Sequence, residues 1–93
     1  MKSLKARILI VDDEPMLRRT MSDRLGFWGC TTEEAATGEE ALDILKERSF
    51  DLVMLDIKMP GISGLEVLAK MRERGDGTDV VVLTAHASVE AAV

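Results

Sequence analysis

The sequence predicts an α/β fold built on a doubly wound parallel sheet, and two observations support this prediction. Three short, unbroken aliphatic runs have the length of strands and lack polar alternation, as expected of strands that are covered on both faces. Longer segments between these runs place apolar residues three or four positions apart, which is the spacing of one helix face. This alternation indicates βαβ units, and right-handed crossovers in such a chain make a doubly wound sheet.

The strands are predicted from the aliphatic runs, which comprise residues 8–11, 52–55 and 80–83. A weaker and more polar run at 30–35 indicates a fourth strand, which we expect at an edge of the sheet. The predicted order along the chain is therefore β-α-β-α-β-α-β-α.

The first two helices carry recognisable start signals. Pro15 is placed where a proline in the first helical turn is tolerated, and Gly26 lies near the predicted end of that helix. Thr37 and Glu40 have the spacing of a capping box, which predicts a second helix running to about residue 48.

Two further helices are expected. The third begins near Gly64 and is closed by Gly75. Ser88 has the character of a cap for a fourth helix, of which the sequence contains little more than one turn.

Length and charge limit the classes of function. With 93 residues, 46% of them hydrophobic and 31% charged, the chain is expected to be one small domain or part of one. Its net charge of −5 argues against direct binding to nucleic acid or to an anionic membrane and favours a cation as ligand. The single cysteine, Cys30, excludes an internal disulfide, and no signal-peptide or membrane-spanning pattern is present, so we expect a cytoplasmic protein.

Polar residues follow three of the predicted strands: Asp12 and Asp13 the first, Asp56 the third, and Thr84 the fourth. The carboxyl ends of parallel strands share one edge of the sheet, so the carboxylates should meet and bind a divalent cation such as Mg²⁺ or Mn²⁺. Capping of the following helix is the alternative for each aspartate. It fits Asp56 least, because residues 57–61 follow it before the next predicted helix begins, and a helix cap should directly precede its helix.

Segments 11–14, 51–61 and 83–85 together resemble the motifs of two-component response-regulator receiver domains, with the same order and spacing. The resemblance extends over the whole chain, residues 1–93. It implies a flavodoxin-like fold with strand order 2-1-3-4.

The resemblance also assigns roles at the strand ends. Asp56 matches the phosphoacceptor, which takes a phosphoryl group from a histidine kinase or phosphotransfer protein. Asp13 matches the residue that binds Mg²⁺ directly. Asp12 matches its partner, which usually binds through water, and the backbone carbonyl of Lys58 matches a further ligand. The family members promote their own phosphotransfer and dephosphorylation and are not turnover enzymes.

The resemblance places the switch after the fourth strand. Thr84 matches the hydroxyl that turns toward the phosphoryl oxygens, and the backbone N–H of Ala85 is expected to donate to them. The readout should involve the loop and helix that follow, with an output domain that this chain does not include. Residues 83–90 also resemble receivers of enhancer-binding transcription activators.

Receiver domains have a fifth strand, which ends in a phosphoryl-pairing lysine, and a fifth helix, and both would lie beyond Val93. We therefore expect a partial receiver domain, with weakened or lost phosphotransfer and self-association through the exposed fourth strand. Three explanations fit the expected lack of the fifth strand and helix: a shortened chain, a proteolytic remnant, or a component of a swapped or complemented assembly.

Two other classes of function share some of these features. Haloacid-dehalogenase-like phosphatases also use a strand-end aspartate, but they carry Asp-x-Asp after the first strand, whereas Asp56-Ile57-Lys58 follows the third. A phosphorylation-independent assembly module is the other alternative.

Overall fold

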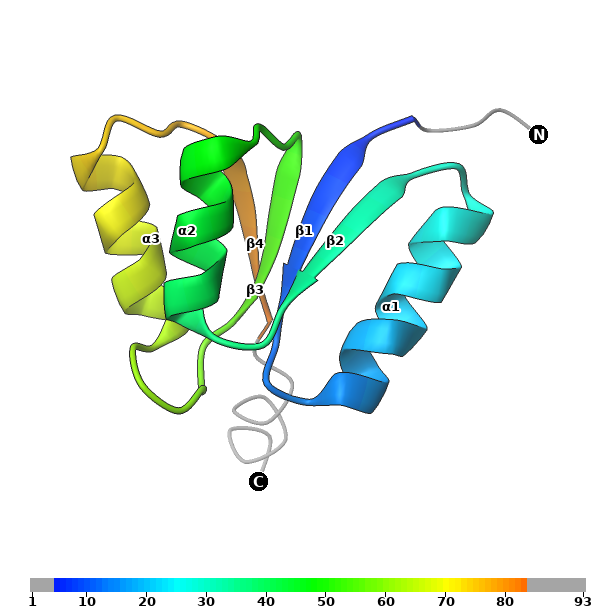
Figure 1. Ribbon diagram of the computed structural model, residues 1–93, viewed down its shortest axis with the longest axis horizontal. Coiled ribbons are helices and arrows are strands. Elements are labelled where there is room, and N and C mark those ends of the chain that lie inside the picture. The colour runs from blue at the N-terminus through cyan, green and yellow to red at the C-terminus, as the bar shows by residue number, and fades with distance from the viewer. Residues whose placement is uncertain (1–4, 84–93) are drawn as a thin grey trace, which may run out of the picture.

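The computed structural model describes residues 5–83, which form a parallel sheet of four strands with three helices (Figure 1). The strands are β1 (Arg7–Val11), β2 (Thr31–Ala35), β3 (Leu52–Asp56) and β4 (Asp79–Leu83). The helices are α1 (Pro15–Phe27), α2 (Gly38–Glu47) and α3 (Gly64–Glu73). The helix expected from Ser88 lies outside the described residues.

The strand order is β2-β1-β3-β4 and every pairing is parallel, which confirms the predicted order and the edge position of β2. In register, Val11 lies opposite Leu55, and Asp56 lies opposite Leu83. Residues that follow β1 therefore reach the same edge of the sheet as the end of β3.

The larger hydrophobic core lies between the sheet and helices α2 and α3 (Figure 1). Leu9, Val53 and Leu55 contribute fully buried side chains from β1 and β3, and Val67 and Met71 do so from α3. Because alternate residues of a strand point to opposite faces, the unbroken aliphatic runs supply this core and a second apolar face at once.

Helix α1 alone covers the described part of the second face. Met21 and Leu25 pack against the cluster around Ile10. However, Leu17 and Trp28 are 42% and 47% exposed, although both share the helical spacing of those residues. Periodicity predicts an apolar stripe on α1, but only part of that stripe packs against the sheet.

Side-chain caps define the starts of α2 and α3. The hydroxyl of Thr37 accepts from the Glu40 N–H at 3.1 Å, and the Glu40 carboxylate accepts from the Ala36 N–H at 2.7 Å. At α3, Ser63 and Glu66 form a complete capping box, which was present in the sequence but not among the predicted caps. These caps fix the residues at which α2 and α3 begin, and so help to position the strand ends that precede them.

Candidate functional site

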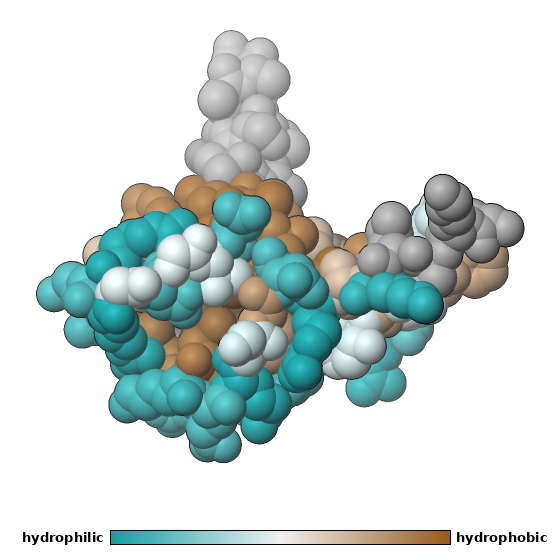
Figure 2. Space-filling view, turned by 90° about the horizontal axis from the view of Figure 1, so that it is seen from above, coloured by the Kyte–Doolittle hydropathy of each residue, from teal (hydrophilic) through white to brown (hydrophobic). Residues whose placement is uncertain are grey.

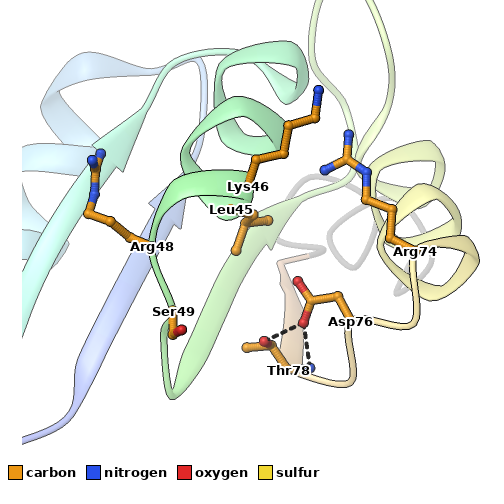
Figure 3. Close-up of a pocket in the computed structure, with 7 residues that line it drawn as sticks. All are labelled: Leu45, Lys46, Arg48, Ser49, Arg74, Asp76 and Thr78. Atoms are coloured by element: carbon orange, nitrogen blue, oxygen red, sulfur yellow. Dashed lines mark hydrogen bonds between the residues drawn. The ribbon is translucent and has the colours of Figure 1, made fainter.

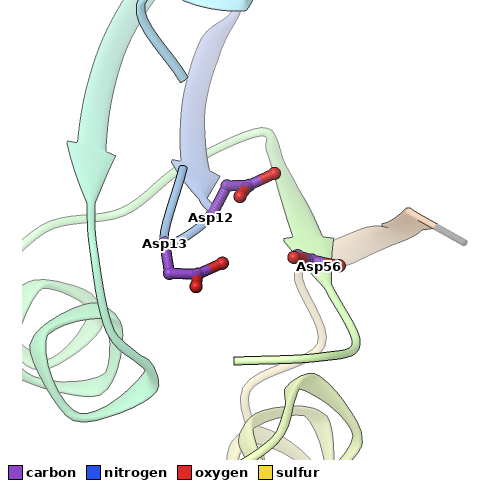
Figure 4. Close-up of side chains that lie close together, drawn as sticks. All are labelled: Asp12, Asp13 and Asp56. Carbon is purple, nitrogen blue, oxygen red and sulfur yellow. The ribbon is translucent and has the colours of Figure 1, made fainter. Parts of the chain in front are cut away.

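Three aspartates at or just after the ends of two strands meet at the carboxyl edge of the sheet. Carboxylate oxygens of Asp12, Asp13 and Asp56 all lie within 4.8 Å of one another (Figure 4). Asp12 and Asp56 are buried, with 2% and 8% of their surface exposed, whereas Asp13 is exposed. The predicted convergence of these side chains is therefore observed.

Hydrogen bonds fix both the backbone and the side chain of Asp12. Its N–H donates to the carbonyl of Ala35 at 3.1 Å, which extends the pairing of β1 with β2 by one residue. Its Oδ1 accepts from the Glu14 N–H at 2.9 Å. Glu14 is the N-cap residue of α1, and its side chain makes no capping hydrogen bond, so Asp12 and Asp13 lie just before the N-cap position and Asp12 binds the N–H of the N-cap residue.

The position of Asp56 depends on a glycine at the start of α3. The N–H of Gly64 donates to the carbonyl of Ile57 at 2.9 Å, which brings the helix directly against the end of β3. A Cβ atom at Gly64 would overlap the backbone carbonyl of Asp56. Gly64 thus permits the close approach that sets the backbone of Asp56, a role that no local sequence pattern indicates.

The charge at this edge favours a cation. Two unit charges 4.8 Å apart repel by about 3 kcal/mol at an effective dielectric constant of about 20. Among residues 5–83, no ion pair involves Asp12 or Asp13. A divalent cation bound among the three carboxylates would turn this repulsion into attraction.

The donor set fits Mg²⁺. All three residues offer oxygen, the ligand type that Mg²⁺ prefers, with ligand distances of about 2.1 Å in an octahedron. Oxygens bound to one such ion lie roughly 3 to 4.2 Å apart, close to the observed upper limit of 4.8 Å. The remaining separation leaves room for one carboxylate to bind through water, as Mg²⁺ sites commonly do.

The other predicted site residues are only partly placed. Lys58 is exposed and lies in the loop after β3, two residues beyond Asp56, and the role of its carbonyl stays a prediction. Thr84 and Ala85 fall outside the described residues, which end at Leu83.

A pocket of about 270 Å³ lies at the opposite edge of the sheet, where β3 and β4 begin (Figure 3). Seen from that end, Figure 2 shows hydrophilic residues around a hollow with hydrophobic atoms inside. Its lining is Leu45, Lys46, Arg48, Ser49, Arg74, Asp76 and Thr78. The helices α2 and α3 end there, so their carbonyl ends would oppose the binding of an anion. Two of its polar residues, Asp76 and Thr78, instead form hydrogen bonds in the turn that leads into β4.

In that turn, Thr78 donates to Oδ1 of Asp76 through its hydroxyl at 2.6 Å and through its N–H at 3.0 Å. The hydroxyl bond is the main reason why the pKa of Asp76 lies below the ordinary value of an aspartate. A lowered carboxyl pKa contributes stability that is present above the unfolded pKa and is lost as the pH falls through the folded one.

We therefore expect Thr78→Val to lower the free energy of unfolding by about 1 kcal/mol at pH 7, because one hydrogen bond to a carboxylate is removed. The difference from the unmodified chain should shrink as the pH falls through the lowered pKa of Asp76 in the folded chain, because the protonated carboxyl group loses the charge that strengthens the bond. Urea denaturation at pH 7 and at pH 3 measures both effects. A difference that grows on acidification would contradict this account.

No helix among residues 5–83 is long and apolar enough to cross a membrane.

Comparison with known proteins identifies relatives with the same architecture. The family model of the response regulator receiver domain matches residues 8–93. "Response regulator MprA" of Mycobacterium sp. (strain KMS) is 42% identical over 86 residues, which cover 92% of this chain but 37% of that protein. The chain thus spans little more than a third of the length of this curated relative.

Two solved structures give the same result. TrrA of Thermotoga maritima in complex with Mg²⁺-BeF is 44% identical, with a TM-score of 0.74 over 83% of this chain and 65% of that one. A structure of TrrA in complex with the histidine kinase ThkA is 45% identical, with a TM-score of 0.80 over 86% and 69% of the two chains. The family match excludes the phosphatase alternative, and the chain belongs to the response regulator receiver domain family.

Proposed function

We propose that this chain is a phosphoacceptor module of a two-component system and that Asp56 receives the phosphoryl group. The observation that carries the proposal is the convergence of Asp12, Asp13 and Asp56 within 4.8 Å at the carboxyl edge of the sheet. Family membership supports the same role. The unit of function proposed for residues 1–93 is a single, partial receiver domain.

In the proposed reaction, a carboxylate oxygen of Asp56 attacks the phosphorus of a phosphohistidine. The P–N bond breaks, its electron pair returns to the imidazole, and an acyl phosphate forms on Asp56. When Mg²⁺ is bound, it offsets the negative charge of the phosphoryl oxygens and of the carboxylates. Asp12, Asp13 and Asp56 would hold that ion, with the Lys58 carbonyl as a further ligand, and Thr84 and Ala85 would bind the phosphoryl oxygens.

The proposed donor is a histidine kinase or a phosphotransfer protein, as in the complex of ThkA with TrrA. The module would act in the cytoplasm on an output domain outside this chain, without itself binding nucleic acid or membrane. It would undergo one phosphorylation and one dephosphorylation per signal and would not be a turnover enzyme. Kinship with enhancer-binding activators stays a prediction.

Incubation of the chain with radiolabelled acetyl phosphate tests the proposal. We expect incorporation that requires Mg²⁺ and is reversed by hydroxylamine, which cleaves an acyl phosphate but not a phosphoserine. Calorimetric titration with Mg²⁺ provides the second measurement, and failure of both binding and labelling would refute the proposal.

The alternative is an assembly module that works without phosphorylation. The observation in its favour is β4, which pairs with β3 only within the described sheet and leaves Val81 46% exposed. Sedimentation with and without Mg²⁺ and beryllofluoride distinguishes the two functions. An oligomer that ignores both additives, in a chain that binds neither, would favour assembly.

A further inference from the structure

Arg18 links three elements next to the aspartate cluster. This α1 side chain is 17% exposed, donates from Nη1 to the carbonyl of Asp12 at 2.8 Å, and donates from Nε to Glu34 of β2 at 3.1 Å. Its neighbour Arg19 also approaches Glu34, at 3.6 Å, but is 72% exposed. The two arginines thus share an ion-pair partner, and Arg18 alone has a hydrogen bond to the Asp12 carbonyl.

The carbonyl that Arg18 contacts belongs to the peptide unit between Asp12 and Asp13. A peptide unit is planar, so fixing the direction of its oxygen also fixes the direction in which the chain leaves for Asp13. The N–H of Asp12 is held from the other side by Ala35. The orientation of two of the three carboxylates therefore depends on a bond made by a residue outside the cluster.

We propose that Arg18 is a positioning residue for the divalent cation site. It would act by holding the peptide between Asp12 and Asp13, while Glu34 orients the guanidinium and offsets its charge. This inference rests on the proposed function, since it assumes that the three aspartates bind Mg²⁺.

The positioning role of Arg18 and its positive charge predict opposite effects of its removal on Mg²⁺ affinity. A guanidinium close to a cation site repels the cation, so removing it would tighten Mg²⁺ binding if its charge dominated. If Arg18 acts by position, removing it weakens binding because the carboxylates lose their alignment. Lysine separates the two effects further, because it keeps the charge but lacks the rigid fork of donors that reaches both Asp12 and Glu34.

The experiment is calorimetric titration of the chain with Mg²⁺, at a temperature well below each variant's melting transition. We expect Arg18→Ala to raise the Kd about 10-fold, the usual scale for the loss of a residue that orients a metal ligand. Arg18→Lys should weaken binding in the same direction. The matched control Arg19→Ala removes the same charge from the same helix and should change the Kd by less than about twofold.

Melting curves recorded without Mg²⁺ separate positioning from stability. A merely structural role would lower the melting temperature and leave the Kd of the folded protein unchanged, which would overturn the inference. Tighter binding by Arg18→Ala, or full affinity in Arg18→Lys, would also overturn it. If Arg18→Ala does not fold, Arg18→Lys decides the question. Absence of Mg²⁺ binding by the unmodified chain would instead refute the proposed function, and this inference with it.

Discussion

Asp56→Asn is expected to reduce Mg²⁺-dependent labelling by acetyl phosphate to background. An amide cannot attack phosphorus as a carboxylate does, and the substitution keeps the size of a side chain that is only 8% exposed. It also removes one of three mutually repelling charges. We therefore expect stability without metal to rise by on the order of 1 kcal/mol while Mg²⁺ affinity falls.

The measurements are incorporation of radiolabel, urea denaturation in metal-free buffer, and Mg²⁺ titration. Asp43→Asn is the matched control, because Asp43 is exposed on α2, away from the carboxyl edge of the sheet. It should retain the labelling of the unmodified chain. Hydroxylamine-sensitive label that persists in Asp56→Asn would show that another residue accepts the phosphoryl group.

Gly64→Ala is expected to lower the free energy of unfolding by about 3 kcal/mol. The added methyl group would overlap the backbone carbonyl of Asp56, and neither backbone segment can move freely, because the Gly64 N–H is bonded to Ile57. The displaced strand end would also misplace the Asp56 carboxylate. Mg²⁺ binding should therefore weaken in the protein that remains folded.

Gly26→Ala is the matched control for this substitution. Gly26 lies in α1, and nothing stands within 4 Å of the place that its Cβ would occupy. Alanine there should stabilise the chain by about 0.5–1 kcal/mol, because it has the higher helix propensity. Urea denaturation compares the two variants, and equal effects of both would contradict the steric argument.

Much of this fold and site could be predicted because it depends on local patterns and on one rule of topology. Aliphatic runs gave the strands, and Thr37 with Glu40 marked the start of α2. The meeting of Asp12, Asp13 and Asp56 followed because parallel strands end at a common edge. The roles of Lys58 and of the residues after Leu83 stay predictions.

What the sequence by itself determined was the order of the elements and the residues that reach the carboxyl edge. Only the tertiary structure decided that Gly64 abuts Asp56, that Arg18 holds the carbonyl of Asp12, and that Leu17 stays partly exposed. The physical reason is that periodicity records which face a side chain occupies along its own element. Which atoms cover that face, and at what distance, depends on how separate elements pack together.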